Sequence, residues 1–361
     1  MIWIKRIAIA LGGLLLLGII GFNVFKAQIA ERAFHRAIER NAGVDPSAAL
    51  PDGLHIYLCG TGSPMPDATR AGPCLGLLAG RRAFVFDVGS GGARNLGSMG
   101  FPVARLEAVY LTHLHSDHID GLGELLLNSW IVGNRSEPTP VRGPTGSAQV
   151  VEGFNAAYQI DSTYRVAHHG PQIANPNGFG GVADEIVIPA GPGGQLVVFE
   201  DSDLKITAIR VDHAPIEPAF GYRVDYKGRS ISISGDTIYQ PRFAAASEGV
   251  DVMFHEALNK EMVQAIGEVL GERGLSGPEQ IFEDILDYHT DPEEAAQAAQ
   301  EANAAHLVYY HIVPQLPVKL LESVFLGDSK SKFDGKITIG EDGMLISLPA
   351  GSDKISIDMT R

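Results

Sequence analysis

The stretch HLHSDH at residues 113–118 places four potential metal ligands within six residues. It directly follows the apolar run AVYLT, which predicts a buried strand, and a helical period begins soon after it. Side chains two apart along an extended backbone point the same way, so His113 and His115 can bind one ion while Asp117 and His118 turn toward a second. Packing these groups in a core without partners would cost several kcal/mol. We therefore predict a metal site at a junction between a strand and a helix.

The rest of the chain reads as short strands that end in glycine or polar residues. Strand-like runs occupy residues 55–62, 74–80, 82–92, 203–213, 220–226, 229–237, 250–257 and 306–311, helical patterns begin near Ala93 and at Pro292, and KITIGEDGMLISL at 336–348 predicts a closing hairpin. Residues 170–194 hold 11 Gly or Pro among 25 residues, which predicts a long loop. Strands mixed with helices in two successive halves predict an α/β fold, with two mixed β-sheets packed face to face and helices outside.

Composition and charge bound the class of protein. The chain has 361 residues, 45% of them hydrophobic and 20% charged, so it can bury one large core or two modest ones. Its formal net charge is −15, and residues 1–40 hold six basic and two acidic groups, which leaves 22 basic against 41 acidic groups elsewhere. A body this acidic repels a phosphate backbone. We therefore expect nucleic acid to be a disfavoured partner unless a local basic patch or a metal overrides the field.

The N-terminal segment is long and apolar enough to span a bilayer. Ile7–Phe25 has nineteen residues with Asn23 as its only polar side chain, which makes a helix of about 28 Å. We predict an uncleaved membrane anchor over residues 1–30, a helix and linker over 31–53, and a folded domain over 54–361. A cleaved signal peptide and a buried soluble helix are the alternatives.

The sequence gives only indirect evidence on which side of the membrane the folded domain lies. Basic residues flank the apolar segment on both sides, so the positive-inside count does not decide its orientation. Cys59 and Cys74 flank a turn rich in Gly and Pro and could pair in an oxidising compartment. The alternative is that both are small buried core residues. We expect a membrane-anchored protein with its folded domain in the periplasm or otherwise outside the cytoplasm.

The segment HLHSDHIDG resembles the H-x-H-x-D-H motif of the metallo-β-lactamase superfamily of dinuclear metallohydrolases. The resemblance covers residues 54–349 and continues, in the family's order, with DVGSGG at Asp87, VDHAP at His213, SGDT at Asp236 and YYHIVP at His311. It implies that residues 54–361 form a hydrolase domain with the αββα sandwich fold. It also implies that one ion is held by His113, His115 and His213, a second by Asp117, His118 and His311, and that Asp236 bridges them.

Within this superfamily the chain is most similar to the ribonuclease Z and arylsulfatase-like branch. The similarity rests on GTGSP at residues 60–64, FHEA at His255 and Glu256, and HTDPEEAA at His289. It implies that His289 donates a proton to the leaving group, helped by a carboxylate, and that Asp117 orients or deprotonates the nucleophile. Asp87, His255 and Glu256 are expected to support the ligands from behind. For His255 and Glu256, a strand-end hydrogen bond and a direct role in the reaction are the alternatives. His306 is expected at the surface or at a helix end.

The chemistry would come from the ions, because two divalent cations about 3.5 to 4 Å apart lower the pKa of a shared water and polarise the bond to be cleaved. No serine or cysteine nucleophile is required. Ligands of imidazole and carboxylate without thiolate favour two zinc ions per chain, with manganese or iron as alternatives. Because the second position of the motif is His115, the redox di-iron members of the superfamily are disfavoured.

Three functions are consistent with these residues. Ribonuclease Z enzymes typically carry a long basic arm between the third histidine and the bridging aspartate, whereas 22 residues separate His213 from Asp236 here. We therefore expect a small-molecule ester substrate, a phosphodiester or aryl sulfate before a lactone or β-lactam, with the lipid bilayer as a second partner. The alternatives are an endoribonuclease that processes the 3′ ends of transfer RNA, and a membrane-tethered protein that binds metal without catalysis. The oligomeric state stays open, with a homodimer among the alternatives.

Overall fold

The computed structural model describes residues 2–189 and 194–360. The chain divides into two compact units, Met1–Ala48 and Ala49–Arg361, and each is described by itself. The first unit holds the helix α1 (Ile2–Asn41) and most of the short 3-10 turn η1 (Pro46–Ala49). The second unit holds every strand of the described chain, together with the residues that the sequence predicts to bind metal.

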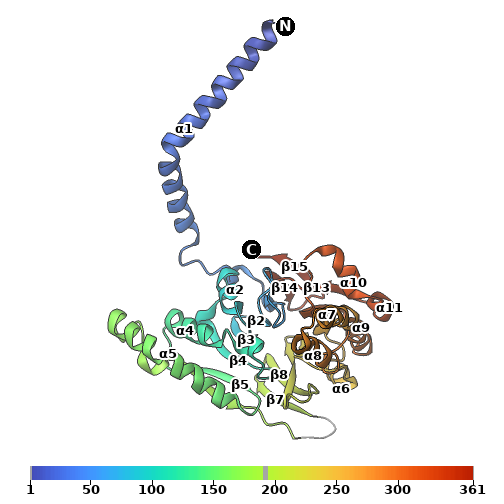
Figure 1. The fold of residues 1–361 in the computed structure, drawn as a ribbon. Coiled ribbons are helices and arrows are strands. Elements are labelled where there is room, and N and C mark those ends of the chain that lie inside the picture. The colour runs from blue at the N-terminus through green and yellow to red at the C-terminus, as the bar shows by residue number, and fades with distance from the viewer. Residues whose placement is uncertain (1, 190–193, 361) are drawn as a thin grey trace. The chain divides into compact units, whose positions relative to one another are not determined.

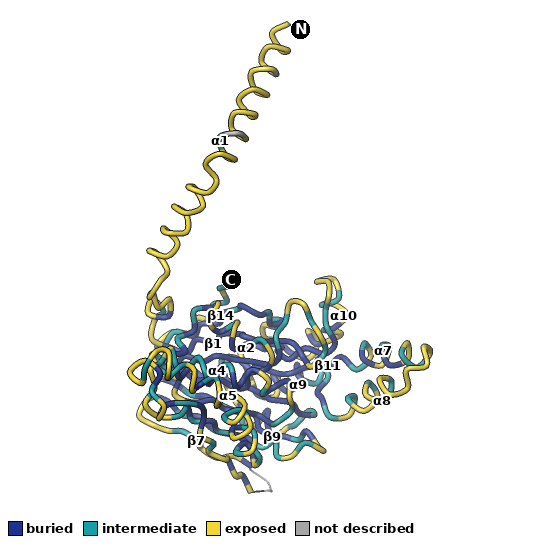
Figure 2. Tube along the Cα trace, turned by 60° about the vertical axis from the view of Figure 1, so that its left-hand side comes forward, coloured by how far each residue is buried: buried dark blue, intermediate teal, exposed yellow. Residues whose placement is uncertain are grey.

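Helix α1 is one continuous helix of 40 residues, so the apolar segment and the charged segment after it are joined without a break. Its most apolar window of 18 residues has a mean hydropathy of 2.4, and Figure 2 colours its described residues as exposed along most of the helix. By length and composition α1 could cross a membrane, and a signal sequence would have the same features. The membrane anchor therefore stays a prediction.

The second unit is built on two β-sheets with helices around them (Figure 1). The first sheet has eight strands in the order β15-β14-β1-β2-β3-β4-β5-β6, and the second has seven in the order β13-β12-β11-β10-β9-β8-β7. The strands of the first sheet are β1 (Gly53–Gly60), β2 (Cys74–Ala79), β3 (Arg82–Val88), β4 (Leu106–Tyr110), β5 (Thr139–Gly143), β6 (Gly181–Glu185), β14 (Met344–Pro349) and β15 (Ser356–Met359). Those of the second are β7 (Gln195–Glu200), β8 (Leu204–Val211), β9 (Ala219–Tyr226), β10 (Arg229–Ile233), β11 (Val252–Leu258), β12 (His306–Val313) and β13 (Lys336–Ile339).

The centre of the first sheet is covered on both faces, because β1 is buried along its whole length and its alternate residues belong to different core clusters. In β1, Leu54, Ile56 and Leu58 belong to a core cluster shared with strands of the second sheet, whereas Tyr57 and Cys59 belong to a cluster shared with helices. A strand buried on both faces reads as a continuous apolar run, which is how these segments appear in the sequence. The predicted arrangement of two mixed sheets with outer helices is confirmed.

The outer helices fall into two groups. Helices α2 (Gly92–Ser98), α4 (Leu122–Gly133) and α5 (Ser147–His169) pack on the first sheet, and α6 (Pro241–Ala246) and α9 (Pro292–Glu301) pack on the second. The remaining helices are α3 (Ser116–Ile119), α7 (Lys260–Glu272), α8 (Ser276–Asp284), α10 (Glu322–Leu326) and α11 (Ser329–Lys332), with 3-10 turns η2 (Val103–Arg105), η3 (Pro176–Gly178) and η4 (Lys319–Leu321). The capping box at Asp291 and Glu294 starts α9 where the sequence predicts a helix.

Two local predictions are wrong. Residues 336–348 do not form a hairpin, because β13 pairs with β12 in one sheet and β14 pairs with β1 in the other. The carboxylate of Asp342 accepts hydrogen bonds from the backbone N–H groups of Thr61 and Ala71, which ties the turn to the first sheet. The region predicted as a loop at 170–194 contains η3 and the edge strand β6, and its residues 190–193 lie outside the described residues.

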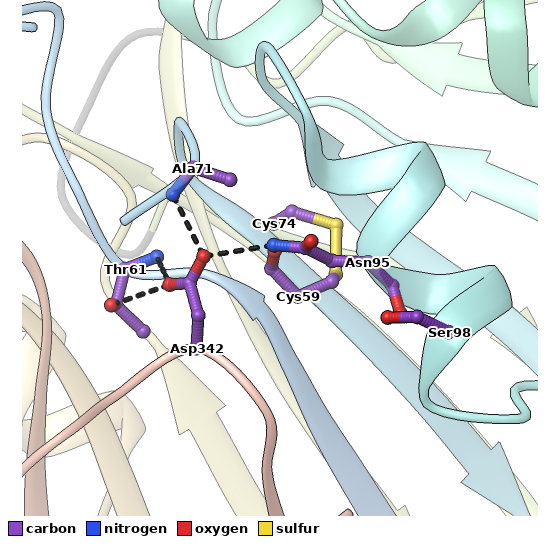
Figure 3. Close-up of a disulfide and its surroundings, with 7 residues drawn as sticks. All are labelled: Cys59, Thr61, Ala71, Cys74, Asn95, Ser98 and Asp342. Atoms are coloured by element: carbon purple, nitrogen blue, oxygen red, sulfur yellow. Dashed lines mark hydrogen bonds between the residues drawn. A yellow bond between two sulfur atoms is a disulfide. The ribbon is translucent and has the colours of Figure 1, made fainter. Parts of the chain in front are cut away.

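Cys59 and Cys74 form a disulfide between the neighbouring antiparallel strands β1 and β2, and both residues are fully buried (Figure 3). The two interpretations of these residues therefore hold together, since the pair is both bonded and part of the core. The Asn95 side chain donates to the Cys59 carbonyl at 2.7 Å and to the Asp342 carboxylate at 2.8 Å. The disulfide thus lies beside the bonds that hold the turn at Asp342.

Reduction of this disulfide is expected to lower the free energy of unfolding by about 3 kcal/mol, because the bond closes a loop with a sequence separation of 15. Denaturant unfolding with and without a thiol reductant measures the difference. The double variant Cys59→Ala, Cys74→Ala is the control and should respond to the reductant by less than about 0.5 kcal/mol. Equal stability of the wild-type chain in both conditions would contradict the prediction.

His306 begins β12 and is buried, which corrects the expectation of a surface or helix-end position. Its Nε2 lies 2.9 Å from the Thr338 Oγ1 on the neighbouring strand. Burial, together with the nearby positive charge of Lys336, lowers the pKa of His306 from about 6.5 to about 4. The folded chain therefore keeps this imidazole neutral at a pH where the unfolded chain would protonate it.

The pKa of His306 predicts acid sensitivity with a definite sign. Because the pKa of His306 is lower in the folded chain than in the unfolded chain, its contribution to the free energy of unfolding is complete above about pH 6.5. That contribution falls as the pH drops toward 4, by at most about 3 kcal/mol. Between pH 7 and 4.5, the free energy of unfolding of His306→Gln should fall by about 2 kcal/mol less than that of the wild type. Denaturant unfolding at both pH values measures the difference. His168→Gln, at the exposed end of α5, should behave like the wild type. Parallel pH profiles for His306→Gln and the wild type would contradict this account.

Candidate metal centre

Strand ends from both sheets bring the predicted ligands to one place. His113 follows β4, His213 follows β8, Asp236 follows β10, and His311 lies within β12. The short helix α3 carries the other two residues of the motif, Asp117 and His118, in its first turn. The structure brings these residues and His115 together as two adjoining groups, although they come from distant parts of the chain.

The first group consists of His113, His115, His213 and Asp236. The Nδ1 of His115 lies 3.0 Å from the His113 Nε2 and 3.4 Å from the His213 Nε2. The Oδ2 of Asp236 lies 3.8 Å from the His113 Nε2 and 3.9 Å from the His213 Nε2. Ligands about 2.0–2.2 Å from a tetrahedral zinc ion are separated by about 3.3–3.6 Å, so these atoms are spaced as such a shell requires.

The second group consists of Asp117, His118 and His311. The His311 Nε2 lies 3.4 Å from the Asp117 Oδ2, and the His118 Nε2 lies 3.6 Å from the same oxygen. The Asp236 Oδ2 is 3.1 Å from the His311 Nε2 and 3.4 Å from the His118 Nε2. One oxygen of Asp236 therefore faces both groups, which is the position of a bridging carboxylate.

Buried polar atoms without partners show that these residues suit a cation. Within the described residues, the Asp117 Oδ2, the Asp236 Oδ1 and the Nε2 atoms of His118 and His311 have no hydrogen-bond partner. Leaving such atoms unsatisfied costs about 1–3 kcal/mol each, and more for charged groups. Divalent metal ions would suit such atoms, because carboxylate oxygens and unprotonated imidazole nitrogens offer lone pairs as ligands.

The charges of the cluster also suit a cation. Burial alone would raise the pKa of Asp117, but His118 and His311 lower it to about 2. Burial would likewise raise the pKa of Asp236, and His311, His118 and His113 hold it well below its usual range. For His311 the carboxylates of Asp236 and Asp117 outweigh burial and raise the pKa to about 10. Both carboxylates thus stay ionised and attract positive charge, which bound metal ions would supply in place of protons.

Asp87, predicted to support the ligands, contacts His118 on the side away from the two groups of ligand atoms. Its Oδ2 accepts from the His118 Nδ1 at 2.8 Å and from the Thr112 Oγ1 at 2.7 Å, while its Oδ1 accepts from the Thr112 N–H at 2.8 Å. Bonding at Nδ1 turns the Nε2 of His118 toward the cluster. Thr112 itself was not predicted, although it immediately precedes the motif. A second unpredicted contact is the Tyr288 carbonyl, which accepts from the His213 Nδ1 at 2.9 Å.

Asp87 and His311 share an unusual backbone conformation. Their φ angles are +50° and +47°, and both lie where the strand register shifts by one residue. A β-bulge with left-handed backbone redirects a side chain, and such strain is found at functional sites. The bulges explain how two residues inside alternating strands both face the cluster.

His289 and Glu256 form a buried pair beside the cluster. The His289 Nδ1 donates to the Glu256 Oε1 at 3.1 Å, and the same oxygen accepts from the backbone N–H groups of Thr290 and Thr237 at 3.0 and 3.3 Å. The Nε2 of His289 thereby remains available for proton transfer. His255 instead packs its ring against Phe243 with centroids 5.7 Å apart, and its Nδ1 bonds the Glu256 carbonyl. The predicted supporting role therefore suits Glu256, and the contacts of His255 do not support it.

A cavity of about 340 Å³ opens onto the cluster. Its polar lining includes His115, Asp117, Asp236, His289 and His311. The predicted proton donor and the bridging carboxylate thus line the same space as ligands from both groups. A substrate in this cavity would contact all the predicted catalytic groups at once.

Comparison with known proteins agrees with this geometry. Residues 86–312 match the family described as "Beta-lactamase superfamily domain". The chain is 35% identical to ribonuclease Z of Mycobacterium bovis over 291 residues, covering 80% of this chain and 96% of that protein. It is 33% identical to ribonuclease Z of Mycobacterium avium over 301 residues, covering 83% of this chain and the whole of that protein.

Solved structures show the same fold. The metallo-beta-lactamase fold protein YhfI from Bacillus subtilis superposes with a TM-score of 0.57 at 20% identity, covering 82% of this chain and all of that one. The short form of human tRNase Z superposes with a TM-score of 0.55 at 23% identity, covering 82% and 99%. The chain therefore belongs to the metallo-β-lactamase superfamily, in its ribonuclease Z branch. It is a metal-dependent hydrolase of this fold.

These comparisons correct one expectation. We expected a small-molecule ester as substrate and nucleic acid as a disfavoured partner, and relatives at 35% and 33% identity named ribonuclease Z contradict both. The argument from net charge failed because it averages over the whole surface. Ions held at the cluster would reverse the sign of the potential where a phosphate must bind.

Proposed function

We propose that the chain cleaves phosphodiester bonds of RNA with two divalent metal ions, as a ribonuclease Z-type endonuclease. The single observation that carries this proposal is the 35% identity to ribonuclease Z over 96% of that relative's length. The cluster of seven potential ligands supports it, since both groups lie within the matched region. Precursor transfer RNA is the first substrate to test.

We propose that zinc occupies both groups, because their donors are imidazole nitrogens and carboxylate oxygens without thiolate. His113, His115 and His213 would hold one ion, Asp117, His118 and His311 the other, and Asp236 both. Two such ions would supply a hydroxide from water at neutral pH and neutralise charge that develops on the phosphoryl group.

The side chains around the ions would position the reactants. Asp117 would orient the attacking water from within the second group. His289 would donate a proton from its Nε2 to the leaving oxygen, and Glu256 would keep the imidazole ring in place through the bond to Nδ1. Asp117 and His289 both line the cavity, so a phosphodiester held there could reach the group that orients the water and the group that protonates the leaving oxygen, and no side-chain nucleophile would be needed.

The test uses the full chain in detergent, loaded with zinc and given a precursor transfer RNA with a 3′ extension. We expect one cleavage near the 3′ end and about two metal ions per chain by elemental analysis. Asp236→Ala, purified identically, controls for contaminating nuclease. Cleavage of chromogenic phosphodiesters or sulfates without cleavage of RNA would overturn the proposal, and so would full metal occupancy with no hydrolysis of any substrate.

We further propose that α1 anchors the enzyme in a membrane, with the folded domain outside the cytoplasm. The apolar, exposed length of α1 supports the anchor, and the disulfide supports an oxidising compartment. A reporter fused after Asn41 that is active only in the cytoplasm would refute the location. The result also decides which RNA the enzyme meets, because precursor transfer RNA is made inside the cell.

A further inference from the structure

The cavity has a second, apolar wall that the catalytic groups do not use. Ile281, Phe282, Ile285 and Tyr288 line it together with Met65 from the loop after β1. The first two lie in α8, and the others lie in the segment between α8 and His289. Among the described residues, none that lines this cavity is Lys or Arg.

The wall is held by a helical hairpin, α7 and α8, with its own small core. Phe282 and Ile285 pack against buried Leu258, Val263 and Val313. The helices approach closely at Gly267, where a Cβ would lie 3.2 Å from the Cβ of Phe282. The inner side chains of the hairpin thus pack against the body of the second unit.

Ile281 differs from these residues, because 59% of its surface is exposed although it lines the cavity. A large apolar side chain left in water contributes little to folding stability. Tyr288 brings the wall up to the reaction centre, with its ring centroid 4.8 Å from that of His213 and 4.9 Å from that of His289. The apolar surface therefore extends from the mouth of the cavity to the ligands.

We infer that this wall binds the unpaired base of a nucleotide next to the scissile bond. The inference rests on the proposed function and adds the form of RNA that is accepted. In RNA, the phosphates suit the metal groups, and the flat base is the part that an aromatic and aliphatic surface can bind. A base in a duplex has its faces covered by stacking neighbours, so only an unpaired nucleotide can lie against Tyr288 and Ile281. The wall thereby selects cleavage in single-stranded segments.

Oligoribonucleotides test this wall directly. Single abasic sites are placed on the 5′ or the 3′ side of the scissile bond, and kcat/KM is measured for the full chain loaded with zinc. We expect one of the two abasic sites to lower kcat/KM about tenfold. Ile281→Ser should lower kcat/KM about three- to tenfold on intact RNA. On the abasic RNA that is cleaved poorly, the same substitution should leave kcat/KM unchanged, because the base that Ile281 would contact is already absent.

Two variants control the result. Val269→Ser removes another exposed apolar side chain, from α7 and outside the cavity lining, and should leave cleavage of both substrates unchanged. Ile281→Met keeps an apolar surface and should restore most of the activity on intact RNA. Equal losses for Ile281→Ser on intact and abasic RNA, or no effect of either abasic site, overturn the inference and leave RNA cleavage standing. Failure to cleave any RNA overturns the proposed function and the inference with it.

Discussion

Asp236→Ala is expected to abolish RNA cleavage, with a loss of about a thousandfold or more, and to reduce bound metal to fewer than one ion per chain. The Asp236 Oδ2 lies within 3.1–3.9 Å of four imidazole nitrogens that belong to both groups. Without it both proposed ions would lose a negatively charged ligand, and the four histidines would lose the one carboxylate that they share. Elemental analysis and single-turnover cleavage measure the two effects together.

Asp353→Asn provides the matched control for Asp236→Ala, because it removes one carboxylate from the exposed chain after β14. Metal content and rate should equal those of the wild type. The assignment of Asp236 as the shared ligand would be wrong if its alanine variant kept two ions and lost less than about tenfold in rate.

His289→Ala is expected to slow RNA cleavage by about 10²- to 10⁴-fold and to have little effect on bis(p-nitrophenyl) phosphate. The leaving oxygen of RNA is an alkoxide that needs a proton, whereas nitrophenolate leaves without one. The Nδ1 of His289 bonds Glu256, so its Nε2 is the atom available to donate. Steady-state rates on both substrates, at equal metal content, measure the difference.

Glu256→Gln separates positioning from proton donation. The glutamine can still accept from the His289 Nδ1 and from the Thr290 N–H, so we expect a smaller loss on RNA than for His289→Ala. Equal losses on both substrates for His289→Ala would show that this residue shapes the cavity and donates no proton to the leaving group.

The part of the candidate site that comes from residues close together in the sequence could be predicted from the sequence. His113, His115, Asp117 and His118 stand together at a strand-to-helix junction, and the division into two groups agrees with the direction of side chains two apart on extended backbone. The order of strands and helices along the chain likewise predicted two mixed sheets with helices outside.

Other features depend on contacts between segments far apart in the sequence. Asp-Gly at residues 342–343 has the local pattern of a hairpin turn, but Asp342 is bonded to Thr61 and Ala71 and sends β14 into the other sheet. His306 looks like a surface residue until β12 is seen packed between β11 and β13. The apolar wall opposite the ligands exists because the hairpin of α7 and α8 folds over the loop that carries Met65.

By itself the sequence determined the superfamily, the two-sheet architecture and the set of residues proposed to bind metal, because these depend on short-range pattern and on motif order. Only the tertiary structure decided that one oxygen of Asp236 faces both groups, that bulges turn Asp87 and His311 inward, and that Tyr288 lies against His213. Distances of 3 to 4 Å between residues more than a hundred positions apart arise from the packing of the two sheets and their connecting loops. Such distances cannot be predicted from the pattern of residues within a short segment of the sequence.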